Sequence, residues 1–94
     1  MRIVEDNERV SGRLPDGLYF LTYRHRLLVR QGAIYVPLET LDVSVALNSG
    51  RPLQTAIDPE GSQWLFMRAA DVAAVFPDFA DSLKALATRS GCTL

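Results

Sequence analysis

The chain has almost none of the residues that cross-link small proteins. Its 94 residues include one cysteine, Cys92, and one histidine, His25. A single cysteine excludes an intramolecular disulfide, and one cysteine with one histidine gives too few ligands for a Cys/His zinc site. We therefore expect no metal and no cofactor, and a fold that is held together by side-chain packing.

Long apolar runs and an excess of one charge are also missing. The apolar runs of this sequence are short, whereas a membrane-spanning helix needs about 20 apolar residues. The start, MRIVEDNERV, is acidic and lacks the apolar stretch of a signal peptide. The net charge of −1 disfavours a protein that grips phosphate backbones through its overall charge. These features predict a soluble cytoplasmic protein without membrane contact.

The composition is that of a globular protein, with 48% hydrophobic and 22% charged residues. A chain of this length supports one modest core, so we predict a single domain over residues 1–94. The order of local patterns predicts an α+β fold. We expect a small antiparallel sheet of about four or five strands with two hairpins, packed by one to three short helices that are mainly C-terminal.

The first part of the predicted sheet comes from residues 18–30, LYFLTYRHRLLVR, which favour strand. They predict either one half-buried strand or a hairpin that turns near residues 24–25. Successive residues of a strand point to opposite faces, so the odd and the even positions form two separate faces. The odd positions are apolar apart from His25, whereas the parity of the even positions becomes basic with Arg24, Arg26 and Arg30. Gln31 and Gly32 predict a tight turn into a strand over 33–36. Residues 1–12 contain a candidate edge strand.

The second predicted hairpin joins strands 53–57 and 63–67 through the turn tetrapeptide DPEG. Between the hairpins, Leu38, Leu41 and Val45 have helical spacing, which favours a helix. The alternation of apolar residues over 41–47 is also compatible with a strand, so both assignments stay open.

Two short helices are predicted toward the C-terminus. The alanine-rich segment 69–76 favours a helix that ends at Pro77. A second helix is expected to begin with Asp78 as its cap, to place Phe79, Leu83 and Leu86 on one face, and to end at Gly91.

Segments 34–47 and 63–76 resemble each other, because both pass from an aromatic-led apolar run to an Asp-Val pair. Only these two positions are identical, so convergence is favoured over duplication. The stretch WLFMRAADVAAVF (64–76) also resembles the strand-to-helix stretch in the N-terminal module of phage and viral antirepressor-type proteins. That resemblance implies DNA binding and phage regulation. It departs where Phe76 and Pro77 replace Leu-Gly, and it covers too little of the chain to assign the family.

The sequence offers little for catalysis. The parity of His25 favours a core or edge histidine over a catalytic base, and Cys92 lies in a tail that we expect to fray. Asp58 and Glu60 belong to a predicted turn. We predict that the chain is not an enzyme, with a small hydrolase that uses His25 as a remote alternative.

Arginine and aromatic residues are the types enriched at interface hot spots. We interpret five of them as partner-binding residues: Arg24, Arg26, Arg30, Trp64 and Arg68. They predict a non-catalytic protein-interaction module, such as an adaptor or inhibitor from a phage or other mobile element. It would dock on an acidic or apolar surface of another protein, or form a homodimer. The alternative is a nucleic-acid-binding regulator whose arginine stripe contacts phosphates.

Overall fold

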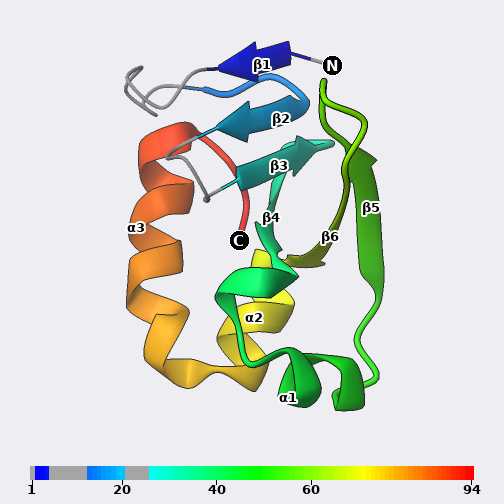
Figure 1. The fold of residues 1–94 in the computed structure, drawn as a ribbon. Coiled ribbons are helices and arrows are strands. Elements are labelled where there is room, and N and C mark those ends of the chain that lie inside the picture. The colour runs from blue at the N-terminus through cyan, green and yellow to red at the C-terminus, as the bar shows by residue number, and fades with distance from the viewer. Residues whose placement is uncertain (1, 5–12, 21–25) are drawn as a thin grey trace.

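The computed structural model describes residues 2–4, 13–20 and 26–94 (Figure 1). Its strands are β1 (Arg2–Val4), β2 (Gly17–Phe20), β3 (Arg26–Arg30), β4 (Ala33–Pro37), β5 (Leu53–Ile57) and β6 (Gln63–Arg68). Its α-helices are α1 (Val43–Asn48), α2 (Ala69–Val75) and α3 (Ala80–Ser90), and its 3-10 turns are η1 (Leu38–Thr40) and η2 (Pro77–Phe79). The predicted α+β class is confirmed.

The strands form one curled sheet in the order β1-β2-β3-β4-β6-β5. Neighbours from β2 to β5 are antiparallel, and β1 adds an edge strand parallel to β2. Both predicted hairpins, β3–β4 and β5–β6, are confirmed. Because β2 and β3 are antiparallel, the hairpin interpretation of residues 18–30 is correct and the single-strand one is wrong. The turn with Arg24 and His25 lies outside the described residues.

The β3–β4 turn is held from two sides. Gln31 and Gly32 have φ angles of 54° and 73°, the left-handed pair of a type I′ turn. The Gln31 N–H donates to Asp16 Oδ1 at 2.9 Å, and the Thr93 N–H donates to the Gly32 carbonyl at 2.8 Å. The C-terminal tail was expected to fray, but its backbone pairs with the start of β4 through Ala33 and Thr93. This pairing satisfies backbone groups that a loose tail leaves to water.

The segment between the hairpins is helical, as one of the two sequence assignments predicted. It is not one continuous helix, because Leu41 is extended between η1 and α1. Asp42 caps α1, and its Oδ1 accepts the Val45 N–H at 3.2 Å. The carboxylate therefore satisfies one of the amide groups that every helix start leaves without a partner.

The C-terminal helices follow the predicted limits with one correction. Pro77 ends α2, and Gly91 ends α3 with a left-handed φ of 65°. Asp78 lies in η2 and does not cap α3; Phe79 precedes α3 and provides no side-chain cap. Phe79 is exposed, so it also does not share the buried face of Leu83. No helix in the described ranges is long and apolar enough to cross a membrane.

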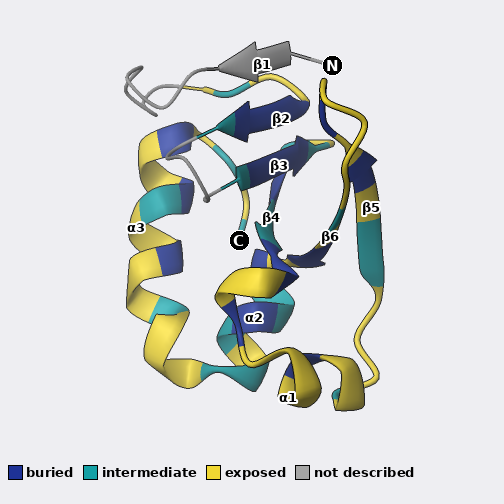
Figure 2. Ribbon diagram, viewed as in Figure 1, coloured by how far each residue is buried: buried dark blue, intermediate teal, exposed yellow. Residues whose placement is uncertain are grey.

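Hydrophobic residues are buried on both faces of the sheet (Figure 2). On one face, α2 and α3 cover a helix-side core that includes Tyr19, Leu27, Val29, Ile34, Met67, Val72, Leu83 and Ala87. On the other face, the curl of the sheet brings together an inner cluster of Leu18, Leu28, Ala56 and Phe66, flanked by Phe20, Tyr35 and Trp64. On the parity that carries the arginines, Leu18 and Leu28 are therefore buried, and Phe20, Arg26 and Arg30 are half-buried.

Candidate functional site

Of the five predicted contact residues, the structure describes four, and of these Arg26, Arg30 and Trp64 are half-buried while Arg68 is exposed. Strand register places Arg26, Arg30, Trp64 and Arg68 on the inner-cluster side of the sheet. Arg26 and Arg30 stand at opposite ends of β3, and the exposed Arg68 ends β6. Arg24 lies outside the described residues. Among the described residues, Arg26 contacts Trp64, Arg30 contacts Gln54 and Thr55 of β5, and Arg68 has no ion pair.

Arg26 covers one end of the inner cluster. Its guanidinium carbon lies 4.0 Å from the centroid of the Phe20 ring and 4.9 Å from that of Trp64. A cation stacked on aromatic rings contributes roughly 0.5–2 kcal/mol, depending on its exposure. These contacts give Arg26 a structural role in the inner cluster and hold one side of the Trp64 ring.

Asp58 holds Trp64 from another direction. Its Oδ2 accepts the Trp64 Nε1–H at 3.0 Å, and its Oδ1 accepts the backbone N–H groups of Glu60 and Ser62, each at 2.9 Å. The Trp64 N–H, these backbone donors and the charge of Arg26 lower the pKa of Asp58, although burial opposes them. Asp58 is therefore an ionised carboxylate at neutral pH that orders the β5–β6 turn and orients Trp64.

Arg30 connects β3 to the edge strand of the sheet. Its Nη1 donates to Gln54 Oε1 at 2.8 Å and its Nη2 donates to the Thr55 carbonyl at 2.9 Å. The Asp58 N–H donates to the Ser62 carbonyl, and hydrogen-bonded residue pairs alternate along the antiparallel strands β5 and β6. The backbone N–H and carbonyl of Thr55 therefore point away from β6. Arg30 thus covers part of the open edge of β5. Open strand edges in general can pair with strands of other chains, and such a cover hinders that pairing.

An open pocket of about 440 Å³ lies beside Arg30. Asp16, Gln31, Tyr35 and Gln54 contribute to its lining. Two of these side chains already have internal roles, because Asp16 holds the β3–β4 turn and Gln54 receives Arg30. Three polar side chains of this pocket, those of Asp16, Arg30 and Gln54, therefore already form hydrogen bonds within the chain.

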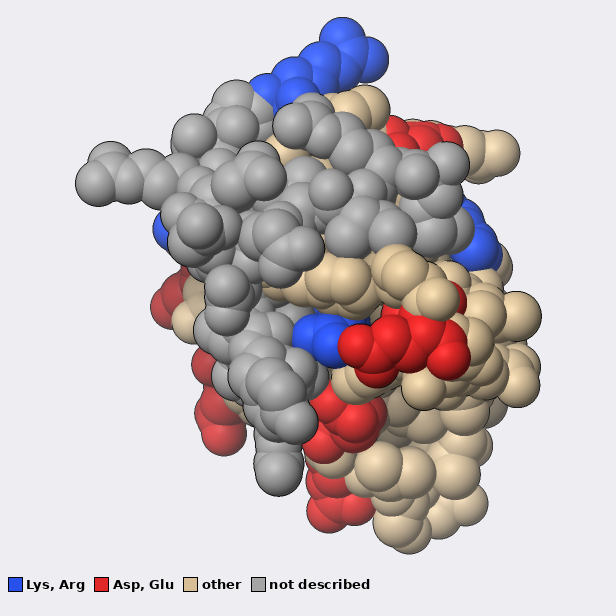
Figure 3. Space-filling view, turned by 45° about the horizontal axis from the view of Figure 1, so that its top comes forward, with Lys and Arg blue, Asp and Glu red and all other residues tan. Residues whose placement is uncertain are grey.

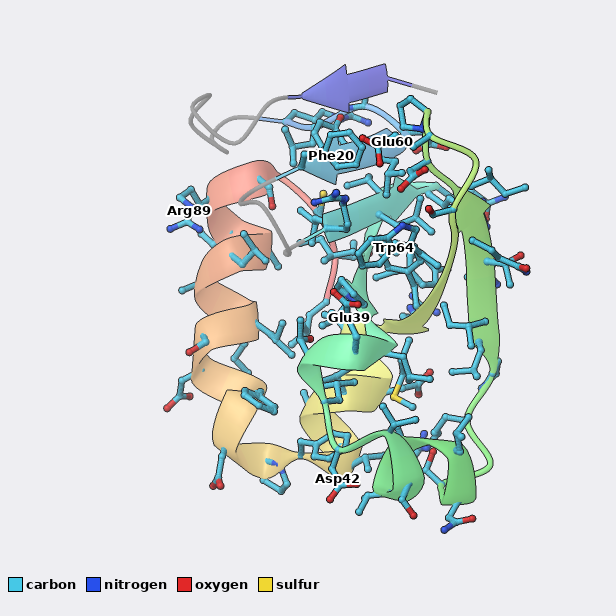
Figure 4. The ribbon with its side chains drawn as sticks, viewed as in Figure 1. Phe20, Glu39, Asp42, Glu60, Trp64 and Arg89 are labelled. Carbon is cyan, nitrogen blue, oxygen red and sulfur yellow. The ribbon has the colours of Figure 1, made fainter. Side chains whose placement is uncertain are left out.

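A second hollow, of about 380 Å³, lies between η1, α1 and β6, and we call it the α1–β6 groove. One wall is formed by Leu38, Glu39 and Val43, and the other by Ser62, Gln63, Trp64 and Leu65. The pairing of β4 with β6 ends at Pro37 and Phe66. The chain then turns into η1, which leaves residues 63–65 of β6 beside η1 instead of beside a strand. Figure 4 shows Glu39 and Trp64 on this side of the molecule.

Apolar side chains are exposed at this groove. Val43 is 43% exposed and Leu65 is 41% exposed, one on each wall. Sequence reasoning selected Trp64 but missed Val43 and Leu65. A signal was present, because apolar residues at 41, 43, 45 and 47 cannot all lie on one face of a helix. The helical assignment for this segment therefore implies exposed apolar side chains.

His25 and Cys92 are the two residues that the sequence analysis considered for catalysis. His25 lies outside the described residues. Cys92 packs against the helix-side core, with its Sγ 3.5 Å from the Ser90 carbonyl oxygen. Within the described ranges, no three His, Cys, Asp or Glu side chains gather in a group that could hold a metal ion.

Comparison with known proteins adds no functional constraint. No protein-family model, curated protein or solved structure matches the chain. The functional argument therefore rests on the α1–β6 groove and on the residues around it.

Proposed function

We propose that this chain is a small non-catalytic protein-interaction domain that docks on another protein through the α1–β6 groove. The proposal keeps Trp64 from the sequence-based site and adds Val43 and Leu65. It does not rely on Arg26 or Arg30, since both guanidinium groups have contacts inside the chain. No metal or cofactor takes part.

The exposure of Val43 and Leu65 on facing walls is the observation that carries this proposal. Exposed apolar side chains are common when scattered singly, but a concentration of them around a hollow is typical of a contact surface. Covering such surface returns roughly 25 cal/mol per Å² of apolar area. A partner side chain seated between the two walls would gain this energy from both.

Trp64 is the aromatic residue in the lining of the groove. Asp58 holds its N–H and Arg26 stacks on its ring, so the indole loses little freedom when a partner binds. Tryptophan is among the residue types enriched at interface hot spots, partly because it presents a large rigid surface. A groove of this size fits a short segment, and we expect weak, about micromolar, binding.

The nucleic-acid alternative loses its main support. It needs a row of free guanidinium groups on one open face, whereas Arg26 and Arg30 stand apart and contact the chain itself. Arg68 is exposed and has no ion pair within the described part of the chain. Among the described arginines of the predicted stripe, Arg68 is the exposed one, and non-specific binding scales with the number of phosphate contacts.

A displayed library of random peptides, selected against the immobilised full chain, tests the proposal. We expect peptides that bind the wild type and lose about tenfold or more in affinity with Val43→Asn or Leu65→Asn, as expected for hot-spot contacts. Val45→Asn is the matched control. Val45 has the same residue type and helix as Val43, has a similar exposure of 45%, and does not line the groove.

Circular dichroism and thermal unfolding of each variant must show that the fold is kept. Sedimentation of the free chain shows whether a second copy occupies the groove, in which case Val43→Asn but not Val45→Asn dissociates the dimer. Selection of no peptide whose binding depends on Val43 or Leu65, together with a monomeric chain, would refute the proposal.

A further inference from the structure

We infer that the segment docked in the α1–β6 groove is basic, with an apolar anchor side chain flanked by lysine or arginine. This inference rests on the proposed function and deepens it. It also reverses one part of the sequence-based expectation, which was that the chain contacts an acidic surface through its own arginines.

The groove is bordered by carboxylates. Among the described residues that line it, Glu39 is the charged one. Asp42 directly precedes Val43, and Glu60 lies in the turn just before Ser62. All three acids are exposed, and Figure 4 places Glu39, Glu60 and Trp64 on the same side of the ribbon. Neither Glu39 nor Glu60 has an ion pair within the part of the chain that the structure describes.

Figure 3 shows the charges on this side of the molecule after it is tilted forward. A small basic patch near the middle lies against an acidic patch, and further acidic patches lie below it, whereas other basic patches lie toward the top and the two sides of the view. A basic segment over the middle and lower part of this view would therefore meet several acidic groups. An acidic segment would bring like charges together, which disfavours binding and slows encounter.

Arg26 is the cation to weigh against these acids. Its guanidinium stacks on Phe20 and Trp64, and its charge acts on Asp58, where it lowers the pKa. The charge of Arg26 is thus partly offset by Asp58, whereas Glu39, Asp42 and Glu60 form no ion pair within the described part of the chain. Negative charge therefore predominates at the border of the groove.

The groove also suits the shape of a basic segment. Lysine and arginine can lay their aliphatic stems along apolar surface while the charged ends stay in water near carboxylates. In Figure 4, Trp64 lies between Glu60 and Glu39, so a segment whose apolar anchor contacts the groove at Trp64 would bring its flanking residues toward both carboxylates. Both elements of recognition, apolar and ionic, are then used together.

The composition of peptides selected by the wild-type chain gives the first test. At low salt, we expect groove-dependent peptides to be enriched in lysine and arginine on both sides of an apolar residue. Groove-dependent peptides with an acidic or neutral composition would overturn this inference and leave the proposed function intact. Failure to find any groove-dependent peptide, together with a monomeric chain, would overturn the proposed function itself.

Charge reversal gives the second test, with a selected lysine-rich peptide as the probe. We expect the double variant Glu39→Lys with Glu60→Lys to weaken binding about tenfold or more at low salt, and the wild-type affinity to fall as salt is raised. The control is the double variant Asp78→Lys with Asp81→Lys, which makes the same change in net charge at two exposed acids of η2 and α3 and should leave binding within about twofold. Equal effects of the two double reversals would show that only net charge matters, and would overturn the inference.

Discussion

The β4-to-α1 and β6-to-α2 segments start from similar sequences and reach different surroundings. Each passes from an apolar strand to an Asp-Val pair at a helix start. Val72 in α2 is 1% exposed and belongs to the helix-side core, whereas Val43 in α1 is 43% exposed and lines the groove. The same local pattern therefore supplies core packing in one segment and open apolar surface in the other.

Neighbouring elements cause this difference. α2 packs against β4, β6 and α3, so its apolar side chains are covered on several sides. α1 makes its main contacts with η1 and stands at one end of the sheet, where Figure 2 shows it mostly exposed. The sheet and α3 cover the apolar side chains of α2, and a binding partner would cover those of α1 in the same way.

Exchange of the two valines for asparagine tests this comparison most strongly. Val72→Asn should lower the free energy of unfolding by roughly 3 kcal/mol or more, because it removes buried apolar surface and buries an amide. Val43→Asn should change it by less than about 0.5 kcal/mol, as is usual for surface positions. Urea unfolding measures both values. Similar losses for the two variants would mean that Val43 is covered in solution and that the comparison fails.

The two aspartates also have different structural roles. Asp42 caps α1, whereas Asp71 lies in the first turn of α2 and does not cap it. Asp42→Ala should cost about 1 kcal/mol, within a usual range of 0.5–2 kcal/mol for a lost N-cap. Asp42→Asn keeps a capping oxygen and should cost only a few tenths of a kcal/mol.

Amide exchange localises the effect of the cap. We expect faster exchange of the α1 amides in Asp42→Ala and unchanged exchange in α2, since a six-residue helix depends strongly on its ends. Unchanged exchange in α1 would mean that packing, and not the cap, holds the helix. Because Val43 is the first residue of α1, the same variant should also weaken peptide binding.

The sequence was sufficient for most local structure. Turn-forming residues marked both hairpins, Pro77 marked the end of α2, and Gly91 marked the end of α3. These features depend on backbone preferences that act over a few residues. The helical assignment near residues 41–47 stayed open because alternating and helical spacing overlap in so short a segment.

The faces of the sheet were harder to predict. Parity separated Tyr19 and Leu27 from Leu18 and Arg26 correctly, but it does not reveal whether a face is open. The curl of the sheet closes the inner face, and two arginines contact its border through stacking and hydrogen bonds. Such curvature arises from contacts between strands that are distant in sequence. Local patterns therefore identified the arginine side of the sheet but assigned it to solvent.

The smallest expected effect on stability comes from the ion pair that joins the two strand-to-helix segments. Arg51, which follows α1, contacts Asp71 of α2 with 3.1 Å between Nη1 and Oδ1. The side chains are 46% and 19% exposed, so water and salt screen much of their attraction. A double-mutant cycle with Arg51→Ala and Asp71→Ala should give a coupling free energy of about 0.2–1 kcal/mol that shrinks as salt is raised.

This coupling decides how independent the two segments are. If it stays small, α1 is held mainly by its own cap and by Leu41 and Ala46, which are buried beneath it. A coupling well above 1 kcal/mol that resists salt would mean that Arg51 and Asp71 clamp α1 to α2. Arg51→Ala would then also alter peptide binding at Val43, because the position of α1 at the groove would depend on its contact with α2.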